Sequence, residues 1–408
     1  MSGKDMALAF DYQKIDQAYL DDPFPTYASL REHDPVHQNP DGTYFLTRYE
    51  DVVLAMRHPA MSSDKTVDFK PRFGDGPLYT HHTTSLVFND DPYHSRVRKL
   101  MSEAFTPRKM AELDPIIDQI VEGLLERLEG EGEFDVLRDF ALALPTEIIA
   151  DMLGVPEEHR HKMHNYSTLI LGALDPIVSD EKMQAGHDAV EEFGALLEEL
   201  IAKRREQPTG AEMGEVLASL IFGEVEGERL SPIELVQNCI FLLNAGHETT
   251  ANLVANGVGI LLDFPDQMDR LREDPSLIKT AVEEFLRFQS PLQVGNRKAL
   301  EEIEMGPEGR KVLIPAGTFL HTCIGAANRD PEIFDDPETV DIGRKPNPQI
   351  AFGIGKHICM GNTLGRIEGH TAIGKFVKKF PKLRLNGEKQ FHGRARFRGL
   401  AQLPVAVN

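Results

Sequence analysis

The chain has 408 residues, of which 41% are hydrophobic and 27% are charged, and its formal net charge is −21. This composition is typical of a globular protein, and the negative charge argues against general binding of nucleic acid or of anionic membranes. The three scattered cysteines exclude a disulfide framework, and the lack of a long apolar stretch in the sequence predicts a cytoplasmic protein without a membrane span.

The first half of the sequence predicts short elements followed by helices. In the segment 39–49, Pro40, Asp41 and Gly42 precede alternating apolar residues, which predicts a turn followed by a strand. From about residue 92 to residue 203 apolar residues recur at steps of three and four, as in "DPIIDQIVEGLLERLEG", which predicts successive helices.

The clearest predicted helix begins after Ser231. Ser231 and Glu234 form a capping box with Pro232 at the first helical position, and the helical pattern continues to Phe264. A continuous helix of this length spans about 50 Å and, being apolar on most sides, belongs inside the molecule. A further helix over 276–291 and short strands over 311–322 complete a mainly α fold with small β-sheets, an α+β arrangement with no repeat or linker.

One short stretch, "AFGIGKHICMGNTLGR" (351–366), surrounds Cys359 with glycines. Its pattern, Phe-Gly-x-Gly-x-His-x-Cys-x-Gly, is formed by Phe352, Gly353, Gly355, His357, Cys359 and Gly361. A lone cysteine is ordinarily a small buried hydrophobe, but glycines allow a flat ring to approach the backbone and leave N–H groups available to a thiolate. A dinucleotide-binding loop is excluded because Ile358 occupies the third glycine position, and no Cys-x-x-Cys pair supports zinc.

This loop resembles the cysteine signature of the cytochrome P450 superfamily, in particular its bacterial, soluble, ferredoxin-dependent thiolate-haem monooxygenases. The resemblance runs from about residue 20 to residue 404 and implies a single triangular haem domain over 1–408. It implies haem b between the long central helix and the cysteine loop, with Cys359 as the axial ligand of the iron and O2 as co-substrate. The residues that it places against the haem are Phe352, Gly353, Gly361, Ala245 and Gly246.

The middle of the long helix, residues 245–250, contains glycine and threonine, which are locally unfavourable in a helix. Close packing at Gly246 and hydroxyl bonds to backbone carbonyls would account for them. The resemblance implies that Glu248 and Thr249 are the catalytic acid–alcohol pair, which delivers protons during oxygen activation with water in a local opening of the helix. His247 either faces solvent or adjusts this relay, and the sequence leaves both possibilities open.

Glu284 and Arg287 match the Glu-x-x-Arg motif of the family, and Arg344 is the expected third member. Taken alone, two opposite charges three residues apart are an ordinary surface pair. The resemblance instead implies a buried structural cluster that takes no part in the chemistry.

The two propionates of a haem require cationic partners. The resemblance implies that these partners are His94 and Arg98, four residues apart on one helix face, together with Arg297 and His357. Each of them alone would be interpreted as a surface group.

No reductase module is expected in the chain, so the resemblance implies electron delivery by a ferredoxin with an NAD(P)H-dependent ferredoxin reductase. A docking face is predicted from the basic residues Lys99, Lys356, Lys375 and Lys378. A hydrophobic small-molecule substrate is predicted from the largely apolar positions Leu242, Leu243, Leu292, Gln293, Val294 and Phe397. His81 and His82 either contact a polar group or are exposed loop residues, and a monomer is expected.

Two other functions were weighed against oxygen insertion. A thiolate-haem peroxygenase or isomerase does not need the pair Glu248 and Thr249. A haem-based gas sensor or carrier needs no proton relay and usually carries an output domain. The sequence therefore predicts a monooxygenase.

Overall fold

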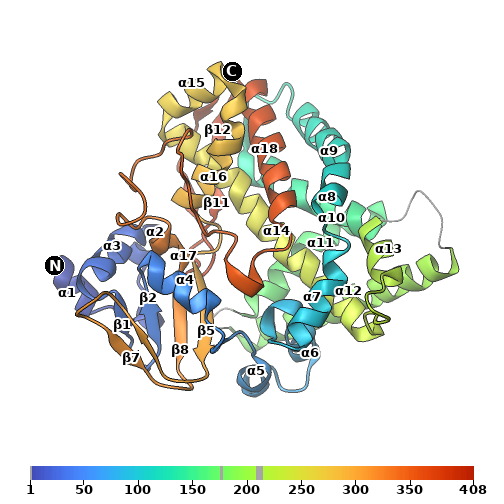
Figure 1. Cartoon of the computed structure of the whole chain (residues 1–408). Helices are drawn as coiled ribbons and strands as arrows, with labels where there is room; N and C mark the ends of the chain where they lie inside the picture. The colour runs from blue at the N-terminus through green and yellow to red at the C-terminus, as the bar shows by residue number, and fades with distance from the viewer. Residues whose placement is uncertain (1, 175–177, 208–214) are drawn as a thin grey trace.

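The computed structural model describes residues 2–174, 178–207 and 215–408. Its helices are α1 (Gly3–Leu8), α2 (Gln17–Asp21), α3 (Phe24–His33), α4 (Tyr49–Arg57), α5 (Thr66–Phe73), α6 (Pro77–Thr84), α7 (Tyr93–Ser102), α8 (Pro107–Glu112), α9 (Asp114–Arg127), α10 (Ala143–Leu153), α11 (Glu157–Gly172), α12 (Asp180–Glu206), α13 (Glu215–Phe222), α14 (Pro232–Asp263), α15 (Pro265–Glu273), α16 (Ile278–Phe288), α17 (Ile324–Ala327) and α18 (Asn362–Lys379). The predicted mainly α architecture is confirmed (Figure 1).

The strands gather into small sheets. They are β1 (Val36–Gln38), β2 (Tyr44–Leu46), β3 (Met61–Ser62), β4 (Glu133–Asp135), β5 (Val294–Ala299), β6 (Ile303–Met305), β7 (Val312–Ile314), β8 (Phe319–Cys323), β9 (Arg384–Leu385), β10 (Gln390–Phe391), β11 (Leu400–Gln402) and β12 (Pro404–Ala406). The main sheet has the order β1-β2-β8-β5-β3, in which only β2 and β8 run parallel. The predicted strands within 39–49 and 311–322 are confirmed as β2, β7 and β8.

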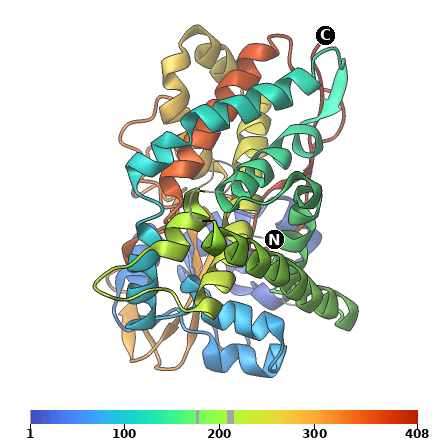
Figure 2. The same ribbon diagram turned by 90° about the vertical axis from the view of Figure 1, so that its right-hand side faces the viewer.

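Helix α14 crosses the middle of the molecule, as Figures 1 and 2 show. Its capping box is present: Ser231 accepts from the N–H of Glu234, and the Glu234 carboxylate accepts from the N–H of Ser231 at 2.9 Å. The helix packs against α6, α10, α11, α12 and α18. A Cβ at Gly246 would lie 2.9 Å from Ile149 on α10, so close packing does explain this glycine.

Three hydrophobic clusters hold the fold together. The largest joins α14 to the surrounding helices, a second joins the main sheet to α4, and a third packs α1 and α3 against the other face of that sheet. In the predicted helical region 92–203 the short strand β4 interrupts the helices, and residues 175–177 lie outside the described residues. Within the part of the chain that is described, no helix combines the length and apolarity needed to cross a membrane.

Candidate active site

The cysteine loop precedes α18 and folds back on itself. The N–H of Cys359 donates to the carbonyl of Phe352 at 2.8 Å. Gly353 and Gly355 have φ angles of +69° and +80°, in the left-handed region that favours glycine. A Cβ at Gly355 would also lie 2.9 Å from the carbonyl of Met56. The conformation of the loop backbone therefore already requires glycine at these two positions, independently of any ring that approaches them.

The surroundings of the Cys359 sulfur include both hydrogen-bond donors and cations. Cys359 is exposed in this structure, but the protein atoms packed around its sulfur desolvate the thiol and raise its pKa, whereas a hydrogen bond from the N–H of Gly361 and the charges of Arg98 and Arg366 lower it. Donors and cations of this kind favour the thiolate form. Arg98 also donates to the carbonyl of Ile358 at 2.7 Å and thereby joins α7 to the loop.

A cluster of cationic and donor groups forms where α7, β5 and the cysteine loop meet. The rings of His94 and His357 lie 4.0 Å apart between centroids. The pKa of His357 is lowered to about 3, first by burial and then by the charges of Arg297, His94 and Arg98, while Asp90 raises it. Both ring nitrogens of His94 are buried and have no hydrogen-bond partner among the described residues. A group that carries two carboxylates would supply the missing partners.

The acid–alcohol pair lies on α14. The Thr249 hydroxyl donates to the carbonyl of Ala245 at 2.7 Å. The Glu248 carboxylate accepts a hydrogen bond from Arg394 at 2.5 Å and lies 3.9 Å from Nε2 of His392. Arg394 and His392 both belong to the segment that precedes β11. Helix α14 is continuous from Pro232 to Asp263, and the expected local opening with water stays a prediction.

Three histidines near this helix are buried. His247 is 2% exposed and its Nε2 lies 3.2 Å from Nδ1 of His164, so the solvent-facing alternative is wrong. Burial is the main cause that lowers the pKa of His247 to about 3. His81 and His82 lie on α6, and His81 contacts Asn244 of α14 at 3.1 Å. The exposed-loop alternative for these two residues is therefore also wrong, because α6 packs against α14.

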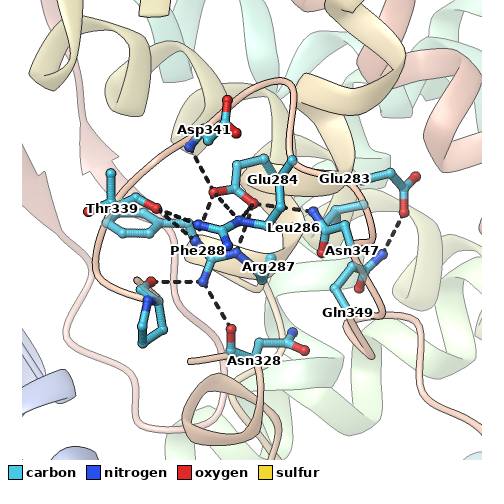
Figure 3. Close-up of polar contacts among 12 residues, drawn as sticks. Glu283, Glu284, Leu286, Arg287, Phe288, Asn328, Thr339, Asp341, Asn347 and Gln349 are labelled. Atoms are coloured by element: carbon cyan, nitrogen blue, oxygen red, sulfur yellow. Dashed lines mark hydrogen bonds and ion pairs between the residues drawn. The ribbon is translucent and has the colours of Figure 1, made fainter. Parts of the chain in front are cut away.

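The Glu-x-x-Arg motif forms a buried polar cluster (Figure 3). Glu284 and Arg287 have fully buried side chains, and two hydrogen bonds of 2.8 Å join them. Arg344 donates to both Glu284 oxygens at 3.2 and 3.1 Å. Arg287 also donates to three backbone carbonyls, those of Asn328, Pro337 and Thr339. This cluster joins α16 to the irregular segment that follows α17, and it is buried as the family resemblance implied.

Comparison with known proteins identifies the family. The family profile described as cytochrome P450 matches residues 36–393. The chain belongs to the cytochrome P450 family. It is 38% identical over 396 residues to the vitamin D(3) 25-hydroxylase of Pseudonocardia autotrophica, covering 95% of this chain and 94% of that enzyme.

One further sequence comparison and one structure comparison match P450 proteins to nearly the whole chain. The biotin biosynthesis cytochrome P450 of Bacillus subtilis is 34% identical, with 95% of this chain and 96% of that protein covered. The crystal structure of P450BioI in complex with hexadec-9Z-enoic acid ligated acyl carrier protein superposes with a TM-score of 0.89 at 34% identity, covering 96% of this chain and 100% of that chain. This P450 is therefore a haem-thiolate monooxygenase that uses haem with O2 as co-substrate.

The side chains of the site fit a haem. The nitrogens of His94, which lack a hydrogen-bond partner among the described residues, lie in a cluster with Arg98, Arg297 and His357 that matches the chemistry of two propionates. The donor and cations around Cys359 match a thiolate ligand. When bound, haem supplies the iron redox chemistry that activates dioxygen.

The predicted pocket residues divide into two groups. Leu292 and Phe397 form a backbone bridge and keep partly exposed side chains. The remaining four have side chains no more than 9% exposed: Leu242, Leu243, Gln293 and Val294. Leu292 and Phe397 are therefore the predicted residues most available to a ligand.

The four predicted docking lysines lie on three elements, and their docking face stays a prediction. Lys99 on α7 pairs with Glu226 at 2.6 Å, and Lys356 lies in the cysteine loop. Lys375 and Lys378 lie near the end of α18, about 20 Å or more along the helix axis from its first residue. The first turn of α18 contacts the cysteine loop through Asn362, which donates to the carbonyl of Cys359 at 2.7 Å, whereas Lys375 and Lys378 lie farther along the same helix.

Sequence reasoning missed two residues next to the acid–alcohol pair. Arg394, the partner of Glu248, is distant in sequence and has no local pattern that would reveal it. Glu368 on α18 is 3% exposed and accepts a hydrogen bond from Thr250 at 3.1 Å. Burial raises the pKa of Glu368 to about 8, so this carboxyl is mainly protonated at neutral pH. The available signal was that Glu368 is the single acidic residue of α18.

We expect the Glu368→Gln variant to lose part of the pH dependence of stability. The folded-state pKa of about 8 lies above the unfolded value of 4.5, so the folded state binds the extra proton and the wild-type protein loses stability as pH rises between these values. The loss is on the order of 5 kcal/mol across this range, and glutamine, which stays neutral and keeps an acceptor for Thr250, should remove it. Melting temperatures of the holoenzyme from pH 5 to 9 measure the effect, with the exposed Glu126→Gln as control. Identical pH profiles for Glu368→Gln and wild type would contradict the buried, protonated state.

Proposed function

We propose that this P450 hydroxylates a hydrophobic organic molecule with electrons from a ferredoxin, which an NAD(P)H-dependent ferredoxin reductase reduces. The observation that carries the proposal is the Cys359 sulfur with its Gly361 N–H donor, in a chain that also holds Glu248 and Thr249 on its central helix. Apolar side chains at Leu292 and Phe397 support a hydrophobic substrate. Two of the compared proteins support a hydrophobic substrate: one is named a vitamin D(3) 25-hydroxylase, and the other was crystallised with an acyl carrier protein that carries hexadec-9Z-enoic acid.

Each polar residue of the site has a proposed task. Cys359 binds the iron, and the haem propionates are held by His94, Arg98, Arg297 and His357. The residues that would lie against the bound ring are Phe352, Gly353, Gly361, Ala245 and Gly246. The Glu248 carboxylate, which Arg394 holds in place, takes up protons from solvent and passes them toward the Thr249 hydroxyl. This hydroxyl would direct the protons to the oxygen that reacts.

Electron transfer requires a partner that docks close to the cysteine loop. Lys99 and Lys356 lie on α7 and in that loop, and their cationic charge suits an acidic ferredoxin. Lys356 is paired with Asp91, so docking would exchange one carboxylate partner for another. This electrostatic attraction makes reduction sensitive to salt, whereas a rate of reduction that is independent of ionic strength would argue against the docking face.

We expect Thr249→Ala to uncouple oxygen consumption from product formation. Loss of the hydroxyl should lower the fraction of NADPH electrons recovered in product by about tenfold or more and release hydrogen peroxide instead, while haem stays bound. The assay uses the holoenzyme, a surrogate ferredoxin and reductase, and a compound selected by its spin-state shift.

Two variants complete this test. Thr168→Ala is the matched control, because Thr168 makes the same bond to the carbonyl four residues earlier, at 3.0 Å, on the exposed face of α11. Thr249→Ser should restore coupling by returning the hydroxyl. Unchanged coupling in Thr249→Ala would reject the proposed relay, and the absence of any oxygenated product in the wild type would reject the proposed function.

A further inference from the structure

Asn244, on the central helix α14, has a buried amide that is hydrogen-bonded at one end. The residue is 4% exposed, and its Nδ2 lies 3.1 Å from Nε2 of His81 on α6. Its Oδ1 is buried and has no hydrogen-bond partner in the part of the chain that the structure describes. A buried carbonyl oxygen without a donor is costly, and a ligand that brings a donor removes this cost.

A chain of hydrogen bonds fixes the direction of this amide. Nδ1 of His81 lies 3.1 Å from Oε1 of Gln237, an atom that can only accept, so this ring nitrogen carries the proton. Burial lowers the pKa of His81 to about 4, so the ring is neutral at neutral pH and its Nε2 is an acceptor. Nε2 therefore accepts a hydrogen bond from Nδ2 of Asn244, and Oδ1 of the amide is turned away from His81.

The position of Asn244 along α14 places its amide between α6 and the proposed substrate pocket. Glu248 lies four residues later, and residues with this spacing are neighbours on one helix face. The Glu248 carboxylate accepts from Arg394, whose guanidinium lies 4.9 Å from the ring centre of Phe397. Phe397 is one of the two predicted pocket residues with a partly exposed side chain. A ligand against Phe397 would therefore lie about one helical turn from the Asn244 amide.

We propose that Oδ1 of Asn244 accepts a hydrogen bond from the substrate, which is therefore a hydrophobic molecule that carries a hydroxyl group apart from the position oxidised. Asn244 determines specificity in this arrangement. His81 is a positioning residue, because it holds the amide with Oδ1 away from α6. A ketone of the same skeleton offers no donor and would leave Oδ1 unpaired. This inference rests on the proposed function, since it names a substrate class for the same pocket.

The experiment compares alcohols with ketones of the same carbon skeleton on the ferric holoenzyme. Cyclododecanol and cyclododecanone form one pair, and menthol and menthone form the second. At least one alcohol should bind about tenfold or more tightly than its ketone by calorimetry, and the spin-state shift should show that it enters the haem pocket. Equal affinities, tighter binding of the ketones, or no binding in both pairs would overturn the proposal. Tighter binding of the ketones would mean that the amide presents Nδ2 to the ligand.

Two variants test the roles of the two side chains. Asn244→Leu keeps the approximate size of the side chain but removes the acceptor, so the ratio of the two affinities should fall close to one. His81→Leu leaves the amide free to rotate and present either atom, so this variant should lose the preference by binding the ketone more tightly. A purely structural role of His81 would instead weaken both ligands alike and keep the ratio. Asn386→Leu, at an exposed asparagine between β9 and β10, is the control and should keep the wild-type ratio.

The wild-type comparison and the second variant still decide the matter if one variant fails to fold. A preference for the alcohol that survives in Asn244→Leu would mean that another group binds the hydroxyl and would overturn the assignment. An unchanged ratio in His81→Leu would overturn the hydrogen-bond chain. Binding needs no turnover, so a failure of monooxygenation would reject the proposed function and leave these results interpretable, whereas equal affinities would reject this inference alone.

Discussion

Cys359→Ser should remove the thiolate absorption band of the reduced carbon monoxide complex and lower monooxygenase turnover by about 1,000-fold or more, roughly 4 kcal/mol of activation free energy. The serine hydroxyl is a poor iron ligand and cannot donate electron density as a thiolate does. The Gly361 N–H and the charges of Arg98 and Arg366, which favour a thiolate at this position, would face a neutral group instead. The optical spectrum of the purified variant and its rate of product formation measure both effects.

Cys323→Ser is the matched control for this substitution. Cys323 is buried, and burial raises the pKa of its thiol to about 12, so it is a neutral group in the third hydrophobic cluster. This control should keep both the thiolate band and turnover. Retention of the band in Cys359→Ser would mean that another residue holds the iron and would overturn the assignment of the whole site.

Arg287→Ala should lower stability by about 3–5 kcal/mol, enough to abolish folding or to prevent haem retention. The substitution leaves Glu284 with Arg344 as its remaining guanidinium partner and removes the donor to three buried backbone carbonyls. Arg287→Lys keeps the charge but cannot reproduce the two parallel bonds to Glu284, so an intermediate loss is expected. Melting temperature and haem content per protein measure the effect.

Arg108→Ala provides the comparison for the buried arginine. Arg108 pairs with Glu112 at 3.3 Å with its side chain 90% exposed, and such a pair contributes less than about 1 kcal/mol. A structural role for Arg287 also predicts that the haem-loaded fraction of Arg287→Lys turns over with normal coupling. Poor coupling in well-folded Arg287→Lys would contradict that role and indicate a direct part in the chemistry.

Local sequence patterns predicted much of the fold and of the site because their physical causes are local. The capping box at Ser231 and the proline after Phe264 specify the ends of α14 through bonds and clashes within a few residues. The spacing of His94 and Arg98 places both on one side of α7 by helical periodicity. Gly353 and Gly355 adopt positive φ angles, which glycine tolerates because it has no Cβ.

Burial was less accessible to sequence reasoning. His81, His82 and His247 are polar residues that the sequence alone could place in solvent or in the interior. Their burial depends on how α6 and α11 pack against α14. The extent of the docking face is likewise not encoded locally, since Lys375 and Lys378 lie far along the long α18 from its first residue.

The sequence by itself determined that a thiolate loop and an acid–alcohol pair are present, because each is encoded by neighbouring residues. Only the tertiary structure decided which distant groups surround them. Arg394 meets Glu248, Thr250 meets Glu368, and His81 meets Asn244 because separate elements pack together across the fold. Burial and long-range pairing set the charge state and partners of these groups, and neither leaves a pattern in the local sequence.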